Sequence, residues 1–331
     1  MRRIDMNRNI IAKMTDAMKI SKDDNVLVNY WSDGDETDLK LFEEVFREKE
    51  ISFKTLVFSD EFLLKLTDEG AEKLDDAFFS PFNDCTMVTD IFKKPAGMPP
   101  EGLKQEKLGD FGAVMRALFS FMSKNEKLIQ ITMPSRINAA LAGEDYEEYR
   151  AKIEKALDID YEALEKTCRD KIESFSSGQL RIKTGEGYEL VMDITGREWN
   201  IDAGEGAFPC GEVYIAPVED KTEGKIYFKD FFLEDKGSFN DIVLTVKDGR
   251  VTDSNCPALN ELLDAQGEGA RIVGELGIGL NPAVSFCGRG ASLDEDALGT
   301  FHIGLGMNFL FGGTNTTRFH MDFVNTGEII G

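Results

Sequence analysis

Residues 25–58, NVLVNYWSDGDETDLKLFEEVFREKEISFKTLVF, predict a strand, a helix and a second strand in close succession. The apolar runs at 25–30 and 51–58 have the length and composition of buried strands. Between them, residues 35–49 carry apolar side chains at helical spacing, namely Leu39, Phe42, Val45 and Phe46. A strand, a helix and a strand in this order favour a parallel sheet covered by helices.

The same alternation continues toward residue 132. Short apolar runs at 85–92 and 127–132 flank a predicted helix at 110–124. Neither G-x-G-x-x-G nor G-x-x-x-x-G-K-[ST] follows any of these strands, so nucleotide binding finds no support. The first part of the chain is therefore predicted to be an α/β domain.

A densely charged segment at 144–175 predicts a helix that links two domains, and Ser176 to Gly178 interrupts its pattern. We therefore expect domains at 1–176 and 177–331. Beyond this point, short alternating segments separated by Gly, Asp and Asn predict an antiparallel sheet, which gives an α+β C-terminal part. Residues 223–226 (EGKI) and 247–250 (KDGR) resemble hairpin turns.

The composition restricts the partners and the compartment. The 331 residues include 61 Asp plus Glu against 38 Lys plus Arg, a net charge of −23, which disfavours nucleic acid and anionic membrane surfaces as partners. Five scattered cysteines without a C-x-x-C motif indicate neither a disulfide framework nor a zinc ribbon. We expect a cytoplasmic protein.

Both histidines lie in one stretch, FHIGLGMNFLFGGTNTTRFHMDFV, residues 301–324. In a strand, His320 and Asp322 would project from the same face, because side chains two residues apart point the same way. A His-x-Asp pair with a second histidine, His302, is typical of a metal site with nitrogen and oxygen ligands. Two structural histidines near a glycine turn are the competing interpretation.

Two glutamates stand in surroundings that suit a metal ligand. Glu212 follows a Pro-Cys-Gly turn, and Glu275 lies in an apolar, glycine-rich run where an unpaired charge is costly to bury. A single glutamate of this kind is also common at an exposed strand end, which is how we interpret Glu219. Arg197 is interpreted as a member of a structural ion pair.

Several motifs in the second half resemble a known family. GREW (196–199), GEVYIAPVED (211–220) and GELGIGLNP (274–282), followed by FHIGLGMN, FGG and HMDFV, are similar in order to the metalloaminopeptidases typified by aminopeptidase T and aminopeptidase S. The resemblance covers residues 178–324. It implies that a pair of divalent metals is held by two Glu, two His and one Asp, which here are Glu212, Glu275, His302, His320 and Asp322.

The resemblance implies a metal-dependent aminopeptidase that acts on short peptides, a homodimer, and an antiparallel sheet that carries the dinuclear site. Zinc, cobalt or manganese suit these ligands, with iron a weaker candidate. Either Glu275 or Asp322 could bridge the metals, and Glu275 is also a candidate catalytic residue.

One residue departs from the family pattern. The family has a tyrosine seven residues after the equivalent of His302, which is thought to stabilise the reacting oxygen, and this chain has Phe309 there. Asn308, Asn315 or Arg318 could supply a replacement donor. Two alternatives therefore stay open, an iron-dependent dihydroxypyridine ring-opening dioxygenase and a non-catalytic protein that binds metal or peptide.

Overall fold

The computed structural model describes residues 2–125, 127–176, 178–233, 236–288 and 293–331, with side chains from residue 7 onward. The chain forms two compact units, each described here by itself. Unit 1 comprises Met1–Tyr161 and Gly204–Pro209, and unit 2 comprises Glu162–Ala203 and Cys210–Gly331. None of the helices in the described ranges combines the length and the apolar character that a membrane span requires.

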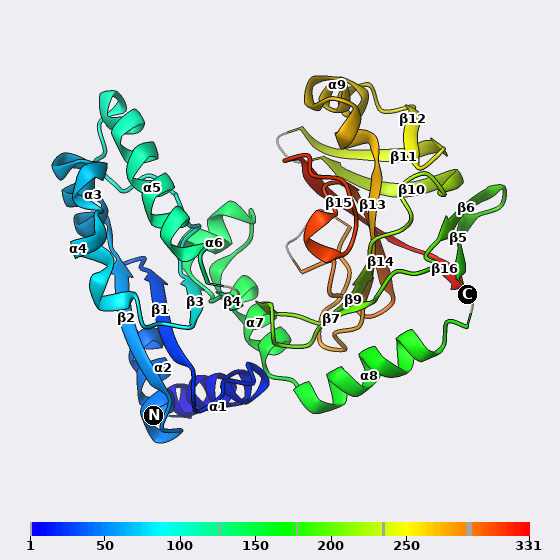
Figure 1. Ribbon diagram of the computed structural model, residues 1–331. Coiled ribbons are helices and arrows are strands. Elements are labelled where there is room, and N and C mark those ends of the chain that lie inside the picture. Colours follow the sequence, from blue (N-terminus) through cyan, green and yellow to red (C-terminus); the bar gives the residue numbers. More distant parts are fainter. Residues whose placement is uncertain (1, 126, 177, 234–235, 289–292) are drawn as a thin grey trace. The chain divides into compact units, whose positions relative to one another are not determined.

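Unit 1 is built on a parallel sheet in which the strands follow the order β2-β1-β3-β4-β8 (Figure 1). The strands are β1 (Asn25–Trp31), β2 (Ser52–Phe58), β3 (Met87–Phe92), β4 (Lys127–Thr132) and β8 (Ala207–Phe208). The first four agree with the apolar runs of the sequence, so the predicted parallel sheet is confirmed. The fifth strand, β8, lies in Gly204–Pro209, where the chain re-enters unit 1, and no strand was predicted there.

Helices cover both faces of this sheet. They are α1 (Arg2–Ala17), α2 (Thr37–Glu48), α3 (Asp60–Glu69), α4 (Asp76–Phe79), α5 (Leu108–Met122), α6 (Arg136–Leu141) and α7 (Tyr146–Leu157), with 3-10 turns η1 (Ala71–Lys73), η2 (Ser80–Phe82) and η3 (Gln105–Lys107). Leu27 and Trp31 of β1 pack with Val114 and Leu118 of α5, whereas the intervening Val28 is buried on the opposite face. The four predicted apolar residues of α2 are all buried, because they form the stripe that faces the sheet.

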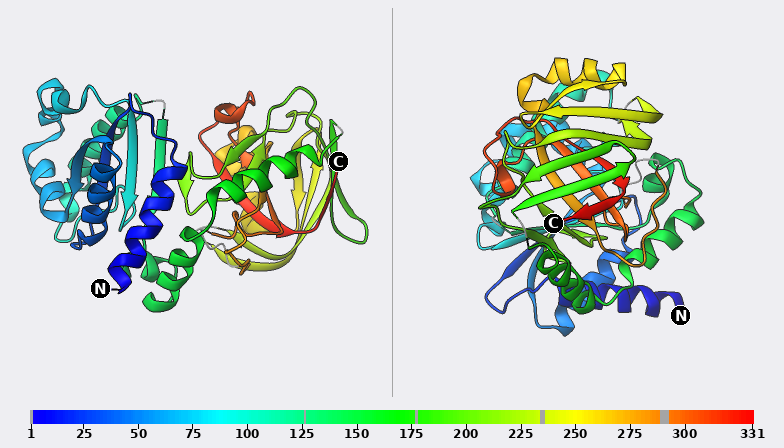
Figure 2. Two further views of the ribbon diagram at one scale, coloured as in Figure 1. Left: turned by 90° about the horizontal axis from the view of Figure 1, so that it is seen from below. Right: turned by 90° about the vertical axis from the view of Figure 1, so that its right-hand side faces the viewer.

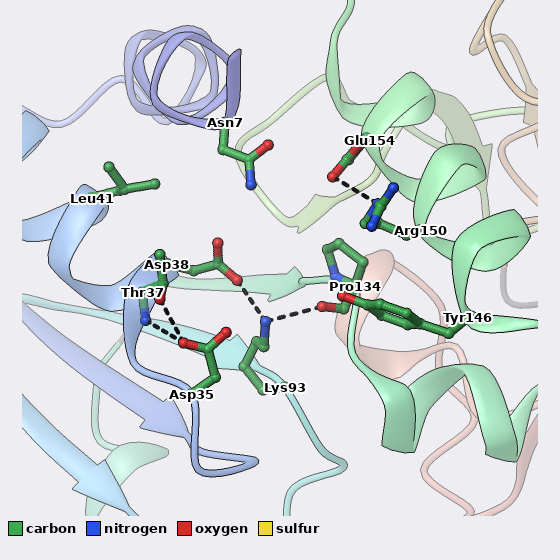
Figure 3. A pocket seen from close by; sticks show the side chains of 10 residues that line it. All are labelled: Asn7, Asp35, Thr37, Asp38, Leu41, Lys93, Pro134, Tyr146, Arg150 and Glu154. Carbon is green, nitrogen blue, oxygen red and sulfur yellow. Dashed lines mark hydrogen bonds and ion pairs between the residues drawn. The ribbon is translucent and has the colours of Figure 1, made fainter. Parts of the chain in front are cut away.

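The carboxyl edge of the parallel sheet holds a polar cavity of about 310 Å³ within unit 1 (Figure 3). At its floor the Lys93 ammonium donates to Asp38 at 2.7 Å and to the Pro134 carbonyl at 3.0 Å. Both charged side chains are buried, at 6% and 9% exposure. Burial lowers the pKa of Lys93, but the Asp38 carboxylate opposes this effect and brings the pKa above its ordinary value. The pair joins the loop after β3 to the first turn of α2.

Unit 2 contains two antiparallel sheets. The six-stranded sheet has the order β12-β11-β10-β6-β5-β16, with β5 (Gln179–Gly185), β6 (Tyr188–Asp193), β10 (Glu223–Leu233), β11 (Gly237–Lys247), β12 (Arg250–Ser254) and β16 (Glu328–Ile330). The five-stranded sheet has the order β15-β14-β13-β9-β7, with β7 (Asn200–Asp202), β9 (Glu212–Ile215), β13 (Val273–Gly279), β14 (Thr300–Gly306) and β15 (His320–Thr326). The predicted antiparallel character of this half is confirmed.

The two expected hairpin turns had different outcomes. Lys247 pairs with Arg250 around Asp248 and Gly249, both of which have positive φ, so the turn at 247–250 is confirmed. The turn expected at 223–226 is wrong. Those residues begin β10, where they pair with β6 and β11, because Gly224 lies against the β6 backbone instead of reversing the chain.

One face of the five-stranded sheet packs into the core of unit 2. Ile303 and Leu305 of β14 and Phe323 of β15 join Phe228 and Phe231 of β10 in one buried cluster. The helices of unit 2 are α8 (Tyr161–Glu173) and α9 (Pro257–Gln266), with 3-10 turns η4 (Glu268–Arg271) and η5 (Phe309–Phe311), and α9 lies at the β12 end of the six-stranded sheet (Figure 2). The side chains that alternate with this cluster must leave from the opposite face of the sheet.

The charged segment at 144–175 forms two helices, α7 and α8, which belong to different compact units. The expected domain limit at 176/177 stays a prediction, while the compact units change over at Tyr161 and Glu162. The reason for this earlier change is that α8 packs on unit 2. The buried Cys168 thiol of α8 lies 3.7 Å from the Glu212 carbonyl of β9.

Candidate metal centre

The five residues expected to bind metal lie on four neighbouring strands of the five-stranded sheet. Glu212 begins β9, Glu275 lies on β13, His302 on β14, and His320 and Asp322 on β15. In the sheet register, Gly304 is paired with Glu275 on one side and with Asp322 on the other. Gly277 is paired in the same way with Tyr214 and His302. Directly opposed residues and residues two apart share a face, so all five side chains project from the face that is turned away from the core.

Glycines on this face of the sheet leave space for the side chains of the neighbouring strands. A Cβ on Gly277 would stand 2.0 Å from a carbon of the His302 ring, and a Cβ on Gly304 would stand 2.7 Å from a carboxylate oxygen of Asp322. The two glycines therefore leave room for the side chains that converge above them. The glycine-rich character of these strands is a requirement of the site.

The ligand atoms form two groups that share one carboxylate. Glu212, Glu275 and His302 form the first group, and Glu275, His320 and Asp322 form the second, with all donor atoms of a group within 4.8 Å of one another. The shared Glu275 places Oε1 at 3.4 Å from His302 Nε2 and Oε2 at 3.3 Å from His320 Nε2. Each oxygen of Glu275 thus faces a different group.

The remaining contacts prepare these groups for a cation. His320 Nδ1 lies 2.8 Å from the Met307 carbonyl, to which it can donate, so Nε2 is the ring nitrogen that faces Asp322 and Glu275 and that could bind a cation after losing its proton. Glu212 Oε2 and Asp322 Oδ1 are buried and accept no hydrogen bond from any residue that the structure describes. A buried acceptor without a donor is costly, and a divalent cation would satisfy both oxygens. The donor set of two imidazoles and three carboxylates therefore fits divalent metal ions.

Burial and mutual attraction shift the ionisation of these groups strongly. Burial raises the pKa of Glu275, but hydrogen bonds from His302 and His320 outweigh it and bring the pKa to about 2. Burial lowers the pKa of His320, but hydrogen bonds to Asp322 and Glu275 raise it to about 10. Burial also lowers the pKa of His302, and the carboxylates around it raise the pKa well above its usual value. Without cations, protons on the imidazoles thus compensate the carboxylates.

Two further carboxylates lie close to the expected ligands. Burial is the largest cause that raises the pKa of Glu295, and Asp322 and Glu275 raise it further. Burial also raises the pKa of Asp296 well above its usual value, together with the charges of Asp202 and Glu295. Sequence reasoning missed Glu295 and Asp296, because an acidic run in a loop has the same composition as a solvated surface.

Glu219 is not the exposed strand-end residue that we expected. Its side chain is 18% exposed and accepts hydrogen bonds from Asn308, from the backbone and hydroxyl of Thr314, and from Arg197. Arg197 also donates to the Gly312 carbonyl. The expectation failed because Glu219 lies against a distant loop, and this ion pair fixes the loop that follows β14.

That loop carries Phe309, at the position where the resemblance implies a tyrosine. The Phe309 side chain is 60% exposed, so its ring does not lie among the buried ligands. The next aromatic residue, Phe311, makes edge contacts of 5.8 Å between ring centroids with both His320 and Tyr214. Sequence reasoning missed Tyr214, although it lies two residues after Glu212 and the same period-two argument that joined His320 to Asp322 would have found it.

Known proteins share sequence or fold with this chain. The sequence profile of the thermophilic metalloprotease (M29) family matches residues 111–328. No curated protein sequence matches the chain.

Among solved structures, wild-type AmpT from Thermus thermophilus is similar over 98% of this chain and 94% of its own, with a TM-score of 0.65 and 18% identity. A 2,5-dihydroxypyridine dioxygenase from Pseudomonas putida KT2440 is similar over 98% of this chain and 93% of its own, with a TM-score of 0.62 and 14% identity. At these identities the likeness shows a common fold. The family match extends over most of the chain and includes all five expected ligands, so this protein belongs to the thermophilic metalloprotease (M29) family.

Proposed function

We propose that this protein is a metal-dependent aminopeptidase that removes the N-terminal residue from short peptides. Two divalent cations would be held by Glu212, Glu275, His302, His320 and Asp322. The observation that carries the proposal is the pair of three-residue ligand groups that share Glu275, in a chain of a metalloprotease family.

The ligand residues have distinct tasks in this proposal. Glu275 would bridge the cations, because each of its oxygens faces one group, and the histidines would be terminal ligands. When bound, such a pair of cations supplies Lewis acidity and lowers the pKa of water toward neutrality. The hydrogen bond from His320 Nδ1 to the Met307 carbonyl would hold the imidazole in the tautomer that a cation needs.

The surrounding carboxylates support a preference for a free N-terminus. Glu295 and Asp296 lie beside the ligand set, where burial and neighbouring carboxylates raise the pKa of both, so a cationic group nearby would favour their charged form. The protonated α-amino group of a peptide is attracted to such a site, whereas the carboxylate of a peptide is repelled from it. The electrostatics therefore favour cleavage from the amino end.

The dioxygenase alternative shares the fold, since one of the similar structures is such an enzyme. A mononuclear iron site of that kind uses two histidines and one carboxylate and leaves positions open for oxygen. Here Glu212 and Glu275 complete a second ligand group next to the first. Five ligands exceed the three that one such iron needs, so we favour the hydrolase.

Counting the metals bound per chain tests the proposal. Protein stripped with a chelator and reloaded with Zn²⁺, Co²⁺ or Mn²⁺ should bind two ions per chain and release N-terminal residues from a dipeptide panel. Glu275→Gln should lose metal and activity together, since affinity typically falls about 10- to 100-fold or more when a ligand is impaired. The matched control is Glu328→Gln, an exposed glutamate of β16, which should retain both.

Each alternative outcome has a separate meaning. One iron per chain with oxygen consumption on a dihydroxypyridine would replace the proposal by the dioxygenase. Two metals without cleavage of any dipeptide, or no metal at all, would leave a binding protein.

A further inference from the structure

The site contains no hydroxyl at the position where the family resemblance implies one. Phe309 has no oxygen, and its side chain is 60% exposed. Two of the three alternative donors expected from the sequence are engaged elsewhere. Asn308 is buried and donates to Glu219, and Asn315 donates to the carbonyls of Gly269 and Gly306. Arg318 is exposed. A donor for the reacting oxygen must therefore come from another element.

Resting on the proposed aminopeptidase function, we propose that Tyr214 is this donor and that its phenol hydroxyl stabilises the oxygen of the scissile carbonyl. Tyr214 lies on β9 two residues after Glu212, so both side chains leave the same face of the strand. Its position in the sheet, its ring contacts and its free hydroxyl each support the assignment.

The sheet register places Tyr214 in one row with a metal ligand. Gly277 of β13 is paired with Tyr214 on one side and with His302 on the other. Because Gly277 has no side chain, the His302 ring occupies the space above it, where a Cβ would stand 2.0 Å from the ring. Tyr214 is thus the next side chain in the row beyond the imidazole, with Glu212 beside it along the strand.

The aromatic contacts place the phenol at the rim of the ligand set. Phe311 meets the Tyr214 ring at 5.8 Å and 83° and the His320 ring at 5.8 Å and 78°. The three rings therefore connect β9 to β15 on the face that carries the ligands, and they flank the space above β13 and β14. Within the described ranges, no other residue forms a hydrogen bond with the Tyr214 hydroxyl. The hydroxyl is free to donate to a substrate.

The chemistry needs one neutral donor at this place. Hydrolysis joins the water oxygen to the carbonyl carbon and moves the π electrons onto the carbonyl oxygen, and the amine nitrogen then leaves with a proton. The phenol donates a hydrogen bond to the carbonyl oxygen while negative charge develops there, and it keeps its own proton throughout. Loss of one such donor commonly lowers turnover about 10²- to 10³-fold.

A swap of the two aromatic residues tests the assignment. We expect Tyr214→Phe to bind two metals and to unfold at the wild-type temperature, but to lower kcat on a dipeptide about 10²- to 10³-fold with little change in KM. Phe309→Tyr in the Tyr214→Phe background should not restore kcat, because the side chain at position 309 is largely exposed and does not lie among the ligands. The matched control is Tyr188→Phe, a tyrosine of β6 in the six-stranded sheet, which should leave kcat unchanged.

Binding provides a second readout that does not depend on turnover. A phosphinic dipeptide analogue, which carries a tetrahedral oxyanion, should bind metal-loaded Tyr214→Phe more weakly than the wild type by calorimetry, whereas a free amino acid should bind both equally. Equal kcat, or equal affinity for the analogue, in Tyr214→Phe and the wild type would overturn the role of Tyr214. A wild type that cleaves no peptide would refute the proposed function, and the analogue affinities would still decide whether Tyr214 faces an oxyanion.

Discussion

Single glycines decide whether the imidazoles and carboxylates of this protein can meet. Gly277 is the clearest case, because the ring of His302 lies where its side chain would be. We predict that Gly277→Ala displaces His302 and weakens metal binding about 10- to 100-fold, the usual range when the support of a ligand is disturbed. Competition with a chromogenic chelator measures the affinity. Gly109→Ala, on α5, is the matched control, since nothing lies within 4 Å of its added Cβ. Equal affinities of the two variants would contradict the prediction.

The ionisation of His320 should appear in the stability of the metal-free protein. Its folded pKa of about 10 lies above the usual value of 6.5, so its protonation stabilises the fold fully below about pH 6.5, and this stabilisation is lost as the pH rises through about 10. We predict that the thermal midpoint of chelator-treated wild type falls between pH 7 and pH 10 more steeply than that of His320→Gln. Metal-loaded wild type should lack this fall, because a bound imidazole carries no second proton. Parallel curves for both metal-free proteins would count against this reasoning.

At the scale of the elements, the buried ion pair of Lys93 and Asp38 links α2 to the loop after β3, and its loss should lower the stability of unit 1. Lys93→Met would leave the buried Asp38 carboxylate without its cation, which typically costs about 3–5 kcal/mol. We predict a loss of this order in the free energy of unfolding of unit 1, measured by denaturant titration. The double variant Asp38→Leu with Lys93→Met should be more stable than the single one, because it removes both charges. A double variant that is less stable would show that the cavity needs the ion pair for another reason.

Elements with a strong period were predictable from the sequence, and their partners were not. The apolar stripe of α2 is recognisable because burial of one helix face imposes a period, whereas β1 is recognisable as a continuous apolar run because both of its faces are buried. β8 has two residues, too few to show a period, and it is held by pairing with β4 and by the buried Phe208. Gly224 was mistaken for a turn residue, since a close approach of two backbones and a chain reversal favour glycine equally.

The sequence predicts which residues could bind a metal, but not what surrounds them. The residue types and spacing of His320 and Asp322 indicate a metal site, and the order of the motifs adds Glu212 and Glu275. Tyr214 carries a residue type that strands favour for packing, so its type gave no signal. The spacing from Glu212 places Tyr214 on the same face of β9, and the register of β9, β13, β14 and β15 shows that this face also carries the other expected ligands.

At the scale of the whole molecule, the family resemblance leads us to propose a homodimer with restricted access to each site. We predict a mass near twice that of the 37.0 kDa chain by light scattering at micromolar concentration. Restricted access further predicts that folded proteins are left intact while dipeptides are cleaved. A monomeric mass would refute the dimer, and rapid digestion of a compact globular substrate would separately refute the restricted access.

The interrupted path of the chain has a consequence for its synthesis. Because Gly204–Pro209 supplies β8 to unit 1, the ribosome must first release residues 162–203, which belong to unit 2. Until then the outer edge of β4 is open, with unsatisfied backbone groups on a nascent polypeptide. The first unit therefore cannot be completed in isolation as it emerges, and the maturation of both units is coupled in time.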